Sequence, residues 1–465
     1  MPPSSERAAP RAAAWAASAL IAAAVALSLA YWPGVMTWDS IRQYGQALSG
    51  RFDDWHPPLM NWIWRELLPL AHGPAPMLVL QLGVYAAGWV LFAGWALRRR
   101  RPRLALALAA ASLTPIAVAL MGAIIKDSLM AALLLAAAGL LAWRGERGGW
   151  PLRLGGVALV VLASCLRFNA FLAGGPLMVG FLSEVLRRTP LRTAATGVIA
   201  TAALLLPMPI ANHLLKAEPS GVQLSLVIFD LGGITEHAGR SVFPPLPVKD
   251  AVAANRACYS PVRWDLYADW AETPCPVGFT PVRAAFAAQR TRPMLFWAGA
   301  ALRQPVAYAE HRLTHFNINA RFLVHDEVER PVHDRSEDND WGYQVTANPL
   351  LHAVDALARY SAHTPLGWPI VWMALAAGVL AVSWRLPTRA VVIPLALSSL
   401  LYGLGYGVFS VSSELRYHLW TMLAALVAAC IAAADLGPRR GRDWLILAAP
   451  PALFATLAAA WRLAG

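Results

Sequence analysis

The chain has 465 residues, of which 57% are hydrophobic and only 14% charged, and its formal net charge is +12. A soluble domain cannot cover so apolar a composition with polar surface, so the composition excludes an ordinary soluble protein and indicates a polytopic membrane protein. Arginine-rich loops and contact with membrane lipid headgroups account for the positive charge, and no nucleic-acid partner is needed to explain it.

Apolar runs recur along the chain at lengths close to the roughly 20 residues that a helix needs to cross the hydrocarbon core. We therefore expect an all-α fold with about eleven transmembrane helices. They are predicted near residues 12–32, 76–97, 104–124, 128–143, 153–166, 169–186, 194–212, 367–384, 389–409, 417–435 and 444–462. Arg7 and Arg11 precede the first run as in a signal peptide, but its length and its Tyr31-Trp32-Pro33 end favour a retained span.

Basic residues in alternate loops predict the orientation, because Lys and Arg are retained in the cytoplasm. With the N-terminus in the cytoplasm, every inside loop is basic. These loops carry Arg98, Arg99, Arg100, Arg101, Arg103, Arg144, Arg147, Arg187, Arg188, Arg192, Arg385, Arg389, Arg439, Arg440 and Arg442. The sequence thus predicts a multi-pass protein of the inner or plasma membrane, with its polar motifs on the periplasmic or extracytoplasmic side.

Two outside segments, residues 33–74 and 213–366, are too long and too polar to be simple connections. We therefore expect an N-terminal transmembrane module (1–212) that includes the first outside loop, a large extracytoplasmic region (213–366) and C-terminal transmembrane helices (367–465). Cys258 and Cys275 lie in the larger segment. They could pair in an oxidising compartment, but the sequence leaves this open.

The first outside loop concentrates groups that are not needed to cross a bilayer. Residues 37–48 suit a short helix in the membrane interface, and Asp39 lies near its start. Asp39 either caps this helix, in competition with Thr37, or is available for chemistry. Asp54 and His56 follow and could equally belong to a solvated turn.

Other charged residues lie at the outside ends of later spans. Lys126 and Asp127 begin the fourth span, Arg167 ends the fifth, and Glu414 and Arg416 follow the ninth. Charge at membrane depth is costly, so such residues are usually functional or paired; the cations could neutralise Asp127 or anchor in lipid headgroups. If three cations converge on one side of a helical bundle, they form a pocket for phosphate or pyrophosphate.

Five short motifs together carry a resemblance to a known class. They are an acidic residue after the first span, DDWHPP at residues 53–58, IIKDS at 124–128, LRFN at 166–169 and SELRY at 413–417. In this combination the chain resembles the GT-C class of polytopic glycosyltransferases, and in particular bacterial mannosyltransferase-like members. The resemblance implies transfer of a sugar from a polyprenyl-phosphate donor to an extracytoplasmic acceptor, which would be a glycan, lipid or protein of the cell envelope.

The resemblance also implies roles for individual residues. Catalytic residues would be Asp39, Asp54 and His56, with Asp39 as general base; the donor phosphate would be bound by Lys126, Asp127, Arg167, Glu414 and Arg416. The family's second acidic position falls on Asp53 or Asp54, which are adjacent and would point apart on an extended chain. This departure leaves open whether a divalent metal, Mg or Mn, takes part. The sequence has no Gly-rich phosphate loop, which fits a lipid donor.

Two rival interpretations remain open. A transporter or flippase of a lipid-linked or anionic solute would use the same basic pocket. An O-antigen ligase or polymerase would use a basic, histidine-bearing outside loop. That interpretation draws on His311, Arg312, His315, Arg321 and His325, although their spacing favours a solvated amphipathic helix over a metal site. Asp230, also in the long loop, could face the same site as Asp39.

Overall fold

The structure of the protein is a computed structural model that describes residues 4–147, 149–182, 186, 188–325, 331–437 and 441–464. Residues 4–13 and 145–147 are described by their backbone alone. Three arginines assigned to inside loops, Arg187, Arg439 and Arg440, therefore lie outside the described residues, as do the side chains of Arg7, Arg11 and Arg147.

The described part of the chain is helical and contains no strand, in agreement with the predicted all-α fold. Its only β-type pairings are three isolated backbone bridges, Val35 with Ala123, Asp53 with Glu218 and Arg263 with Ser412. An all-helical structure is expected of such an apolar chain, because a segment that crosses a bilayer must satisfy its backbone hydrogen bonds internally, as a helix does.

The chain forms two compact units. Unit 1 comprises Met1–Glu218, Val328–Gly403 and Leu415–Thr456, and unit 2 comprises Pro219–Glu327, Leu404–Glu414 and Leu457–Gly465. The predicted outside segment 213–366 thus contributes to both units. Its assignment as one region, together with the modules 1–212 and 367–465, stays a prediction.

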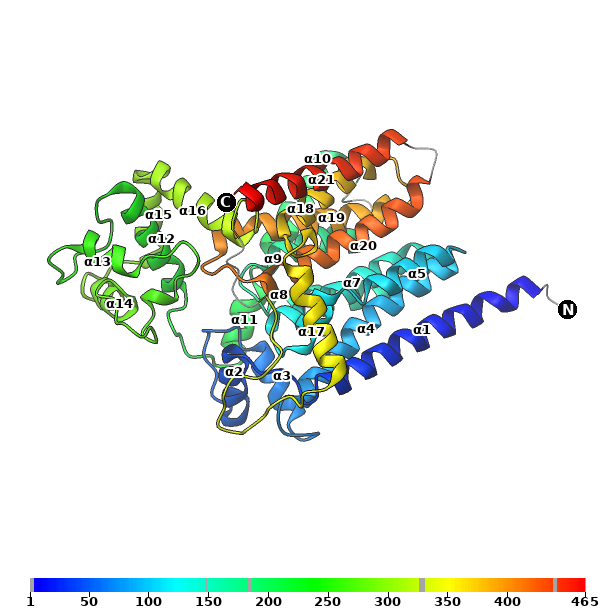
Figure 1. Cartoon of the computed structure of the whole chain (residues 1–465), viewed down its shortest axis with the longest axis horizontal. Helices are drawn as coiled ribbons and strands as arrows, with labels where there is room; N and C mark the ends of the chain where they lie inside the picture. The colour runs from blue at the N-terminus through cyan, green and yellow to red at the C-terminus, as the bar shows by residue number, and fades with distance from the viewer. Residues whose placement is uncertain are drawn as a thin grey trace. The chain divides into compact units, whose positions relative to one another are not determined.

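Unit 1 contains most of the apolar helices (Figure 1). They are α1 (Ser4–Ala30), α2 (Trp38–Ser49), α3 (Leu59–Leu67), α4 (Ala75–Arg98), α5 (Pro102–Ala111), α6 (Pro115–Gly122), α7 (Lys126–Arg147), α8 (Trp150–Ser164), α9 (Ala170–Phe181), α10 (Pro190–Ala203), α11 (Pro207–Leu214), α17 (Pro349–Ala362), α18 (Pro369–Ser383) and α20 (Leu419–Leu436), with 3-10 turns η3 (Pro365–Gly367) and η4 (Leu415–His418). Two further helices, α19 (Arg389–Phe409) and α21 (Gly441–Ala464), begin in unit 1 and end in unit 2.

Unit 2 is built around shorter helices. They are α12 (Gln223–Ala238), α13 (Ala251–Cys258), α14 (Phe279–Ala288), α15 (Pro293–Arg303) and α16 (Pro305–Asn319), with the 3-10 turn η2 (Asp265–Tyr267).

Six helices of the described chain are long and apolar enough to cross a membrane, or seven if α5 and α6, which are bent by 52°, form one span. The six are Ala75–Arg98, Lys126–Arg144, Pro190–Leu214, Arg389–Phe409, Leu415–Leu436 and Gly441–Ala464; shorter apolar helices cover Ala14–Ala30, Trp150–Ser164, Ala170–Phe181 and Pro369–Ser383. Each predicted run falls on one of these helices, except 104–124, which falls on the bent pair of α5 and α6. The count of about eleven spans stays a prediction, because several of the helices are short.

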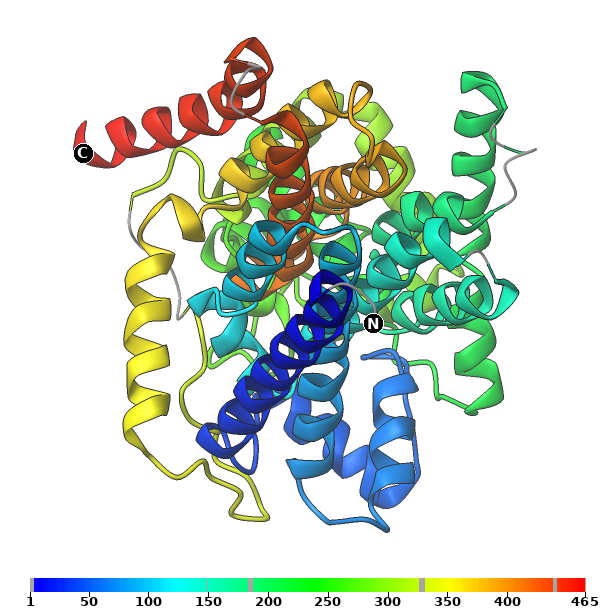
Figure 2. The same cartoon turned by 90° about the vertical axis from the view of Figure 1, so that its right-hand side faces the viewer.

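Helix α7 is the centre of unit 1. It is apolar on all sides and buried along most of its length, as expected of a helix surrounded by other helices. It packs against α4 and α8. Helix α1 packs on α4, as Figures 1 and 2 show. Small residues allow this closeness, because a Cβ on Gly88 would lie 3.0 Å from the backbone nitrogen of Ala136. The start of α7, where Lys126 lies, is therefore held by a rigid core.

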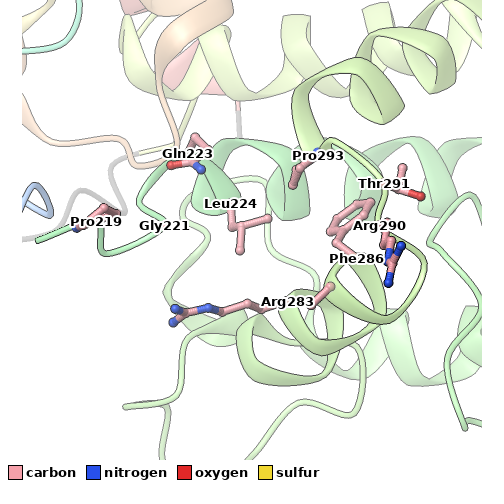
Figure 3. A pocket seen from close by; sticks show the side chains of 10 residues that line it. Pro219, Gly221, Gln223, Leu224, Arg283, Phe286, Arg290, Thr291 and Pro293 are labelled. Carbon is pink, nitrogen blue, oxygen red and sulfur yellow. The ribbon is translucent and has the colours of Figure 1, made fainter. Parts of the chain in front are cut away.

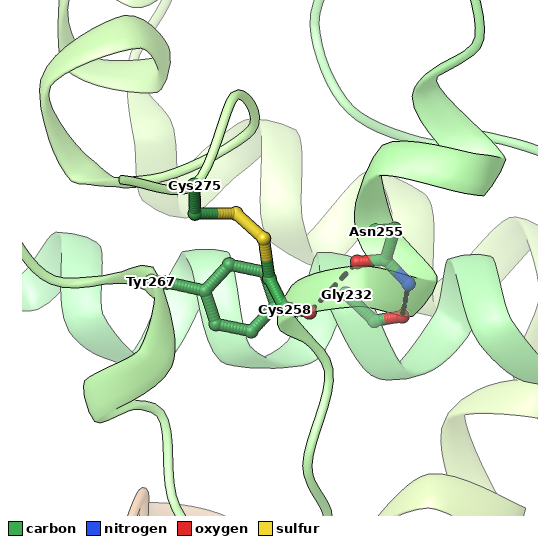
Figure 4. Close-up of a disulfide and its surroundings, with 5 residues drawn as sticks. All are labelled: Gly232, Asn255, Cys258, Tyr267 and Cys275. Carbon is green, nitrogen blue, oxygen red and sulfur yellow. Dashed lines mark hydrogen bonds between the residues drawn. A yellow bond between two sulfur atoms is a disulfide. The ribbon is translucent and has the colours of Figure 1, made fainter. Parts of the chain in front are cut away.

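Unit 2 contains a disulfide between Cys258 and Cys275, so the pairing that the sequence left open is present (Figure 4). Beside it, Tyr267 donates a hydrogen bond of 2.7 Å to Asn255, and the Asn255 amide donates one of 3.0 Å to the carbonyl of Gly232 in α12. The disulfide and these bonds connect the end of α13 to the segment before α14.

Replacing Cys258 with Ser should lower the stability of unit 2. The bridge joins residues 17 apart in sequence, and the loss of a cross-link of that size costs about 3 kcal/mol. The expected result is a lower midpoint of thermal unfolding, with no further drop when a reductant is added. Cys430→Ser is the control, because Cys430 forms no disulfide and its replacement should leave the effect of the reductant intact.

Candidate functional site

The segment that follows α1 is attached by backbone hydrogen bonds to the turn between α6 and α7. The amide of Val35 donates to the carbonyl of Gly122 over 3.1 Å, and the amide of Ile124 donates to the carbonyl of Val35 over 2.8 Å. The side-chain amide of Gln81 in α4 donates to the carbonyl of Met121 at the end of α6 and to that of Ala123 in the turn, at 2.7 and 2.8 Å. This pairing fixes the start of α2 next to the start of α7.

Helix α2 begins with Thr37 as its cap. The Thr37 side chain accepts from the amide of Ser40, and the Ser40 hydroxyl accepts from the amide of Thr37, which completes a capping box. Asp39 is the second residue of the helix and does not cap it. Its carboxylate is therefore not used by the helix end.

Asp39 is instead held by two cations. Its Oδ2 atom accepts hydrogen bonds from Nη1 of Arg416 at 2.8 Å and from Nζ of Lys126 at 3.3 Å. The ring of His56 lies on the other side, with Nε2 at 3.7 Å from Oδ1. The structure thus brings together four residues that the sequence singled out separately.

Electrostatics determine the protonation states of this group. Burial alone would raise the pKa of Asp39, but the charges of Arg416 and Lys126 outweigh it and hold the pKa well below its usual value. Burial, assisted by the charge of Lys126, lowers the pKa of His56 to about 3. Asp39 is therefore ionised and His56 neutral at pH 7.

The tautomer of His56 follows from its contact with Lys126. Nζ of Lys126 lies 2.7 Å from Nδ1 of His56, and an ammonium group can only donate. Nδ1 is therefore the acceptor, and the proton of the neutral ring is on Nε2, which faces Asp39.

A second ion pair lies within the same unit. Arg167 donates to Asp127, whose side chain is only 1% exposed. The guanidinium carbon of Arg167 lies 4.3 Å from the centre of the Tyr417 ring, and that of Arg416 lies 5.5 Å from the same centre. Tyr417 therefore connects the two ion-paired groups through cation–π contacts.

We refer to Asp39, His56, Lys126, Asp127, Arg167, Arg416 and Tyr417 as the Asp39 cluster. Tyr417 is the member to which the sequence assigned no role. Its position directly after Arg416 in the SELRY motif is the signal that could have identified it.

With Lys126 charged, the Asp39 cluster carries three cations, two carboxylates and a neutral histidine, so it has one positive charge in excess. Among the described residues, no three His, Cys, Asp or Glu side chains are grouped so as to hold a metal ion. Mg and Mn prefer several oxygen ligands, whereas the carboxylate of Asp39 already has Arg416 and Lys126 as partners. This donor set does not fit a divalent metal and fits an anion instead.

Asp53 is held by contacts outside the Asp39 cluster. Asp53 forms an ion pair of 2.5 Å with Arg42, and its carboxylate accepts from the amide of Trp55 at 3.0 Å. The backbone amide of Asp54 donates to the carbonyl of Glu218 over 3.1 Å. These interactions fix the loop, and the catalytic role predicted for Asp54 stays a prediction.

Glu414 belongs to unit 2, whereas Arg416, two residues later, belongs to unit 1. Within unit 2, burial and the charge of Glu414 raise the pKa of Asp265. The donor-binding role predicted for Glu414 likewise stays a prediction.

A second polar group in unit 2 surrounds Asp230. Nη2 of Arg312 lies 2.5 Å from Oδ1 of Asp230, and His311 lies 3.1 Å from the same oxygen. Trp297 donates to Oδ2 over 2.6 Å. Asp230 is completely buried, so these partners satisfy its charge inside unit 2.

The expectation of a solvated helix around these histidines is wrong. His311, Arg312, His315 and Arg321 are all buried, at 0 to 5% exposure. The i, i+4 spacing of His311 and His315 places both rings against Phe229 of α12, with ring centres 4.6 and 4.9 Å from it. Hydrogen bonds to backbone carbonyls help to offset this burial: Nδ1 of His315 lies 2.7 Å from the Pro261 carbonyl, and Nη1 of Arg312 donates to the Ser410 carbonyl over 2.6 Å.

A pocket of about 400 Å³ also lies in unit 2 (Figure 3). Its lining includes two arginines, Arg283 and Arg290, with Phe286 between them. Figure 3 shows the two guanidinium groups on different sides of the pocket, with Arg283 extending to the left and Arg290 at the right, so they do not converge on one ligand position.

No protein-family model and no curated protein matches the chain. Among solved structures, the chain is similar to the archaeal oligosaccharyltransferase AglB from Archaeoglobus fulgidus, in complex with an inhibitory peptide and a dolichol-phosphate. The TM-score is 0.38 and the identity 13%, over 96% of this chain and 56% of that one.

The chain therefore spans little more than half the length of that protein. A match at this level assigns no role to any residue of this chain.

His56 should make the protein less stable in acid. Its pKa of about 3 in the folded state lies below the usual value of about 6.5, so the folded state resists protonation. Stability should be complete above pH 6.5 and fall as the pH is lowered towards 3. His56→Asn should reduce this fall, measured as the midpoint of thermal unfolding between pH 7 and 4. His72→Asn, at an exposed site of the same loop, is the control. Identical pH profiles for wild type and His56→Asn would contradict the assignment.

Proposed function

We propose that the chain is a GT-C glycosyltransferase. It transfers a sugar from a polyprenyl-phosphate donor to an extracytoplasmic glycan, lipid or protein acceptor. The observation that carries the proposal is the Asp39 cluster, in which an ionised carboxylate lies among three cations at the ends of apolar helices. A lipid-linked sugar phosphate has the chemistry that this arrangement fits, because its anionic group sits where its apolar tail enters the bilayer.

The proposed reaction is a single displacement at the anomeric carbon of the donor. An acceptor hydroxyl oxygen forms the new bond to that carbon, and the bond between the carbon and the phosphate oxygen breaks with its electron pair going to the phosphate. Asp39 takes the proton of the hydroxyl as general base. The products are the glycosylated acceptor and polyprenyl phosphate.

The cations of the Asp39 cluster have a distinct task in this step. Negative charge on the leaving phosphate grows as the bond breaks, and fixed positive charge stabilises it most at that point. Arg416 and Lys126 are closest to Asp39, and Arg167 is linked to Arg416 through Tyr417. Arginine suits this role because its planar fork binds two phosphate oxygens at once.

The disulfide of unit 2 supports the proposed location. Disulfides persist in oxidising compartments such as the periplasm and the cell exterior. Cys258 and Cys275 lie in the segment that the basic-loop pattern assigns to the extracytoplasmic side. Acceptor recognition by this segment is part of the proposal.

Asp39→Asn should abolish most of the transfer. Asn keeps the shape of the side chain but cannot take the proton, so kcat should fall about 10²- to 10⁴-fold in an assay with purified protein and lipid-linked sugar. Asp355→Asn is the matched control, since Asp355 is an aspartate of unit 1 that pairs with Arg359 at 2.7 Å. Full turnover by Asp39→Asn would exclude Asp39 as the base.

Both the charge and the planar shape of the Arg416 side chain should contribute to binding and turnover of the donor. Arg416→Gln removes both and should reduce kcat/KM for the donor about 10²-fold, the usual effect of losing one stabilising donor. Arg416→Lys keeps the charge, so its loss should be smaller. If both variants match wild type, Arg416 does not bind the donor. Movement of lipid-linked sugar across vesicles without any transfer would favour a transporter or flippase.

A further inference from the structure

We propose that Asp39 occupies the donor-phosphate position in the empty enzyme and that the phosphate of the donor displaces it. The carboxylate that accepts the proton is then released only when the donor is bound. This inference rests on the proposed function and adds a coupling between donor binding and base activation.

The hydrogen bonds of Asp39 motivate the inference. One oxygen, Oδ2, accepts from both Arg416 and Lys126, at 2.8 and 3.3 Å. A phosphate oxygen between the same two cations would need the same bonds, because carboxylate and phosphate are the groups that arginine and lysine bind in this manner. Asp39 and the phosphate therefore compete for the same two cations.

The solvent exposure of the two carboxylates in the Asp39 cluster indicates which of them a phosphate can displace. Asp127, the partner of Arg167, is 1% exposed, whereas the side chain of Asp39 is 23% exposed. Lys126, His56 and Arg416 around Asp39 are each 10 to 11% exposed. The three cations are thus equally accessible to an incoming anion, since Arg167 is 12% exposed, but only Asp39 among the two carboxylates is exposed enough to leave its partners.

Displacement would change the proton affinity of Asp39. Three groups face it, namely Arg416 from η4, Lys126 from α7 and His56 from the loop before α3, and Arg42 acts on His56. Arg416 and Lys126 hold the pKa of Asp39 low against the opposing effect of burial. Once a phosphate takes their hydrogen bonds, burial dominates and the pKa of Asp39 rises, which makes it a better base.

The same exchange affects His56. Lys126 donates to Nδ1 of His56 in the empty enzyme, over 2.7 Å. If Lys126 turns to the phosphate, that nitrogen is released and Nε2 stays directed at Asp39. The donor would therefore have to bind before the acceptor hydroxyl can lose its proton.

The experiment compares anion affinity in wild type and Asp39→Asn. The full chain in detergent is titrated calorimetrically with a short-chain polyprenyl phosphate and, separately, with inorganic phosphate. Asn is neutral and competes less for the cations, so Asp39→Asn should bind polyprenyl phosphate about tenfold more tightly while its transfer activity is lost. Asp39→Ser removes the same carboxylate and should also bind more tightly, which keeps the test valid if one variant does not fold.

The two probes and a control separate the outcomes. A gain for both probes identifies the phosphate headgroup as the competing ligand, and a gain for the lipid alone means that the tail is needed to place it. Asp355→Asn should bind as wild type does.

Unchanged or weaker binding by both Asp39 variants overturns the displacement, even if their transfer is lost as the proposed function requires. Retained transfer by Asp39→Asn overturns the proposed function itself, whatever the affinities are.

Discussion

One oxygen of Asp39 holds two cations that come from positions 87 and 377 residues away in the chain. Removing such charges from water costs several kcal/mol for each ion, and mutual pairing is what offsets that cost. The cluster therefore exists only when the first outside loop, the start of α7 and η4 are assembled together. This dependence ties the chemistry of the site to the packing of unit 1.

The assembly rests on backbone hydrogen bonds and on a rigid helix. Val35 pairs with the turn that precedes α7, and Gln81 satisfies one carbonyl of that turn and one at the end of α6. Buried carbonyls without partners are costly, so these bonds leave the turn little freedom. Since α7 is buried in the core, Lys126 is presented from a fixed position, which is what electrostatic stabilisation of a leaving group needs.

Asp230 and Asp39 differ in a way that separates structure from function. Asp230 is completely buried and surrounded by Arg312, His311 and Trp297. Asp39 has a similar number of polar partners, yet its side chain is 23% exposed. A closed ion pair can only support its unit, whereas an accessible one can exchange partners with a ligand. The accessible cluster is therefore the better candidate for chemistry.

Local features of the sequence determined the helices and the inventory of polar residues. Apolar runs and helix caps depend on neighbours in the chain, so the predicted runs coincide with apolar helices and the helix near residues 37–48 is present as α2. Tertiary structure alone decided which of these residues meet. It grouped Asp39 with Lys126 and Arg416, placed Glu414 in unit 2 and buried His311. Periodicity and composition carry no information about such pairings, because they arise from packing between helices that are distant in the chain.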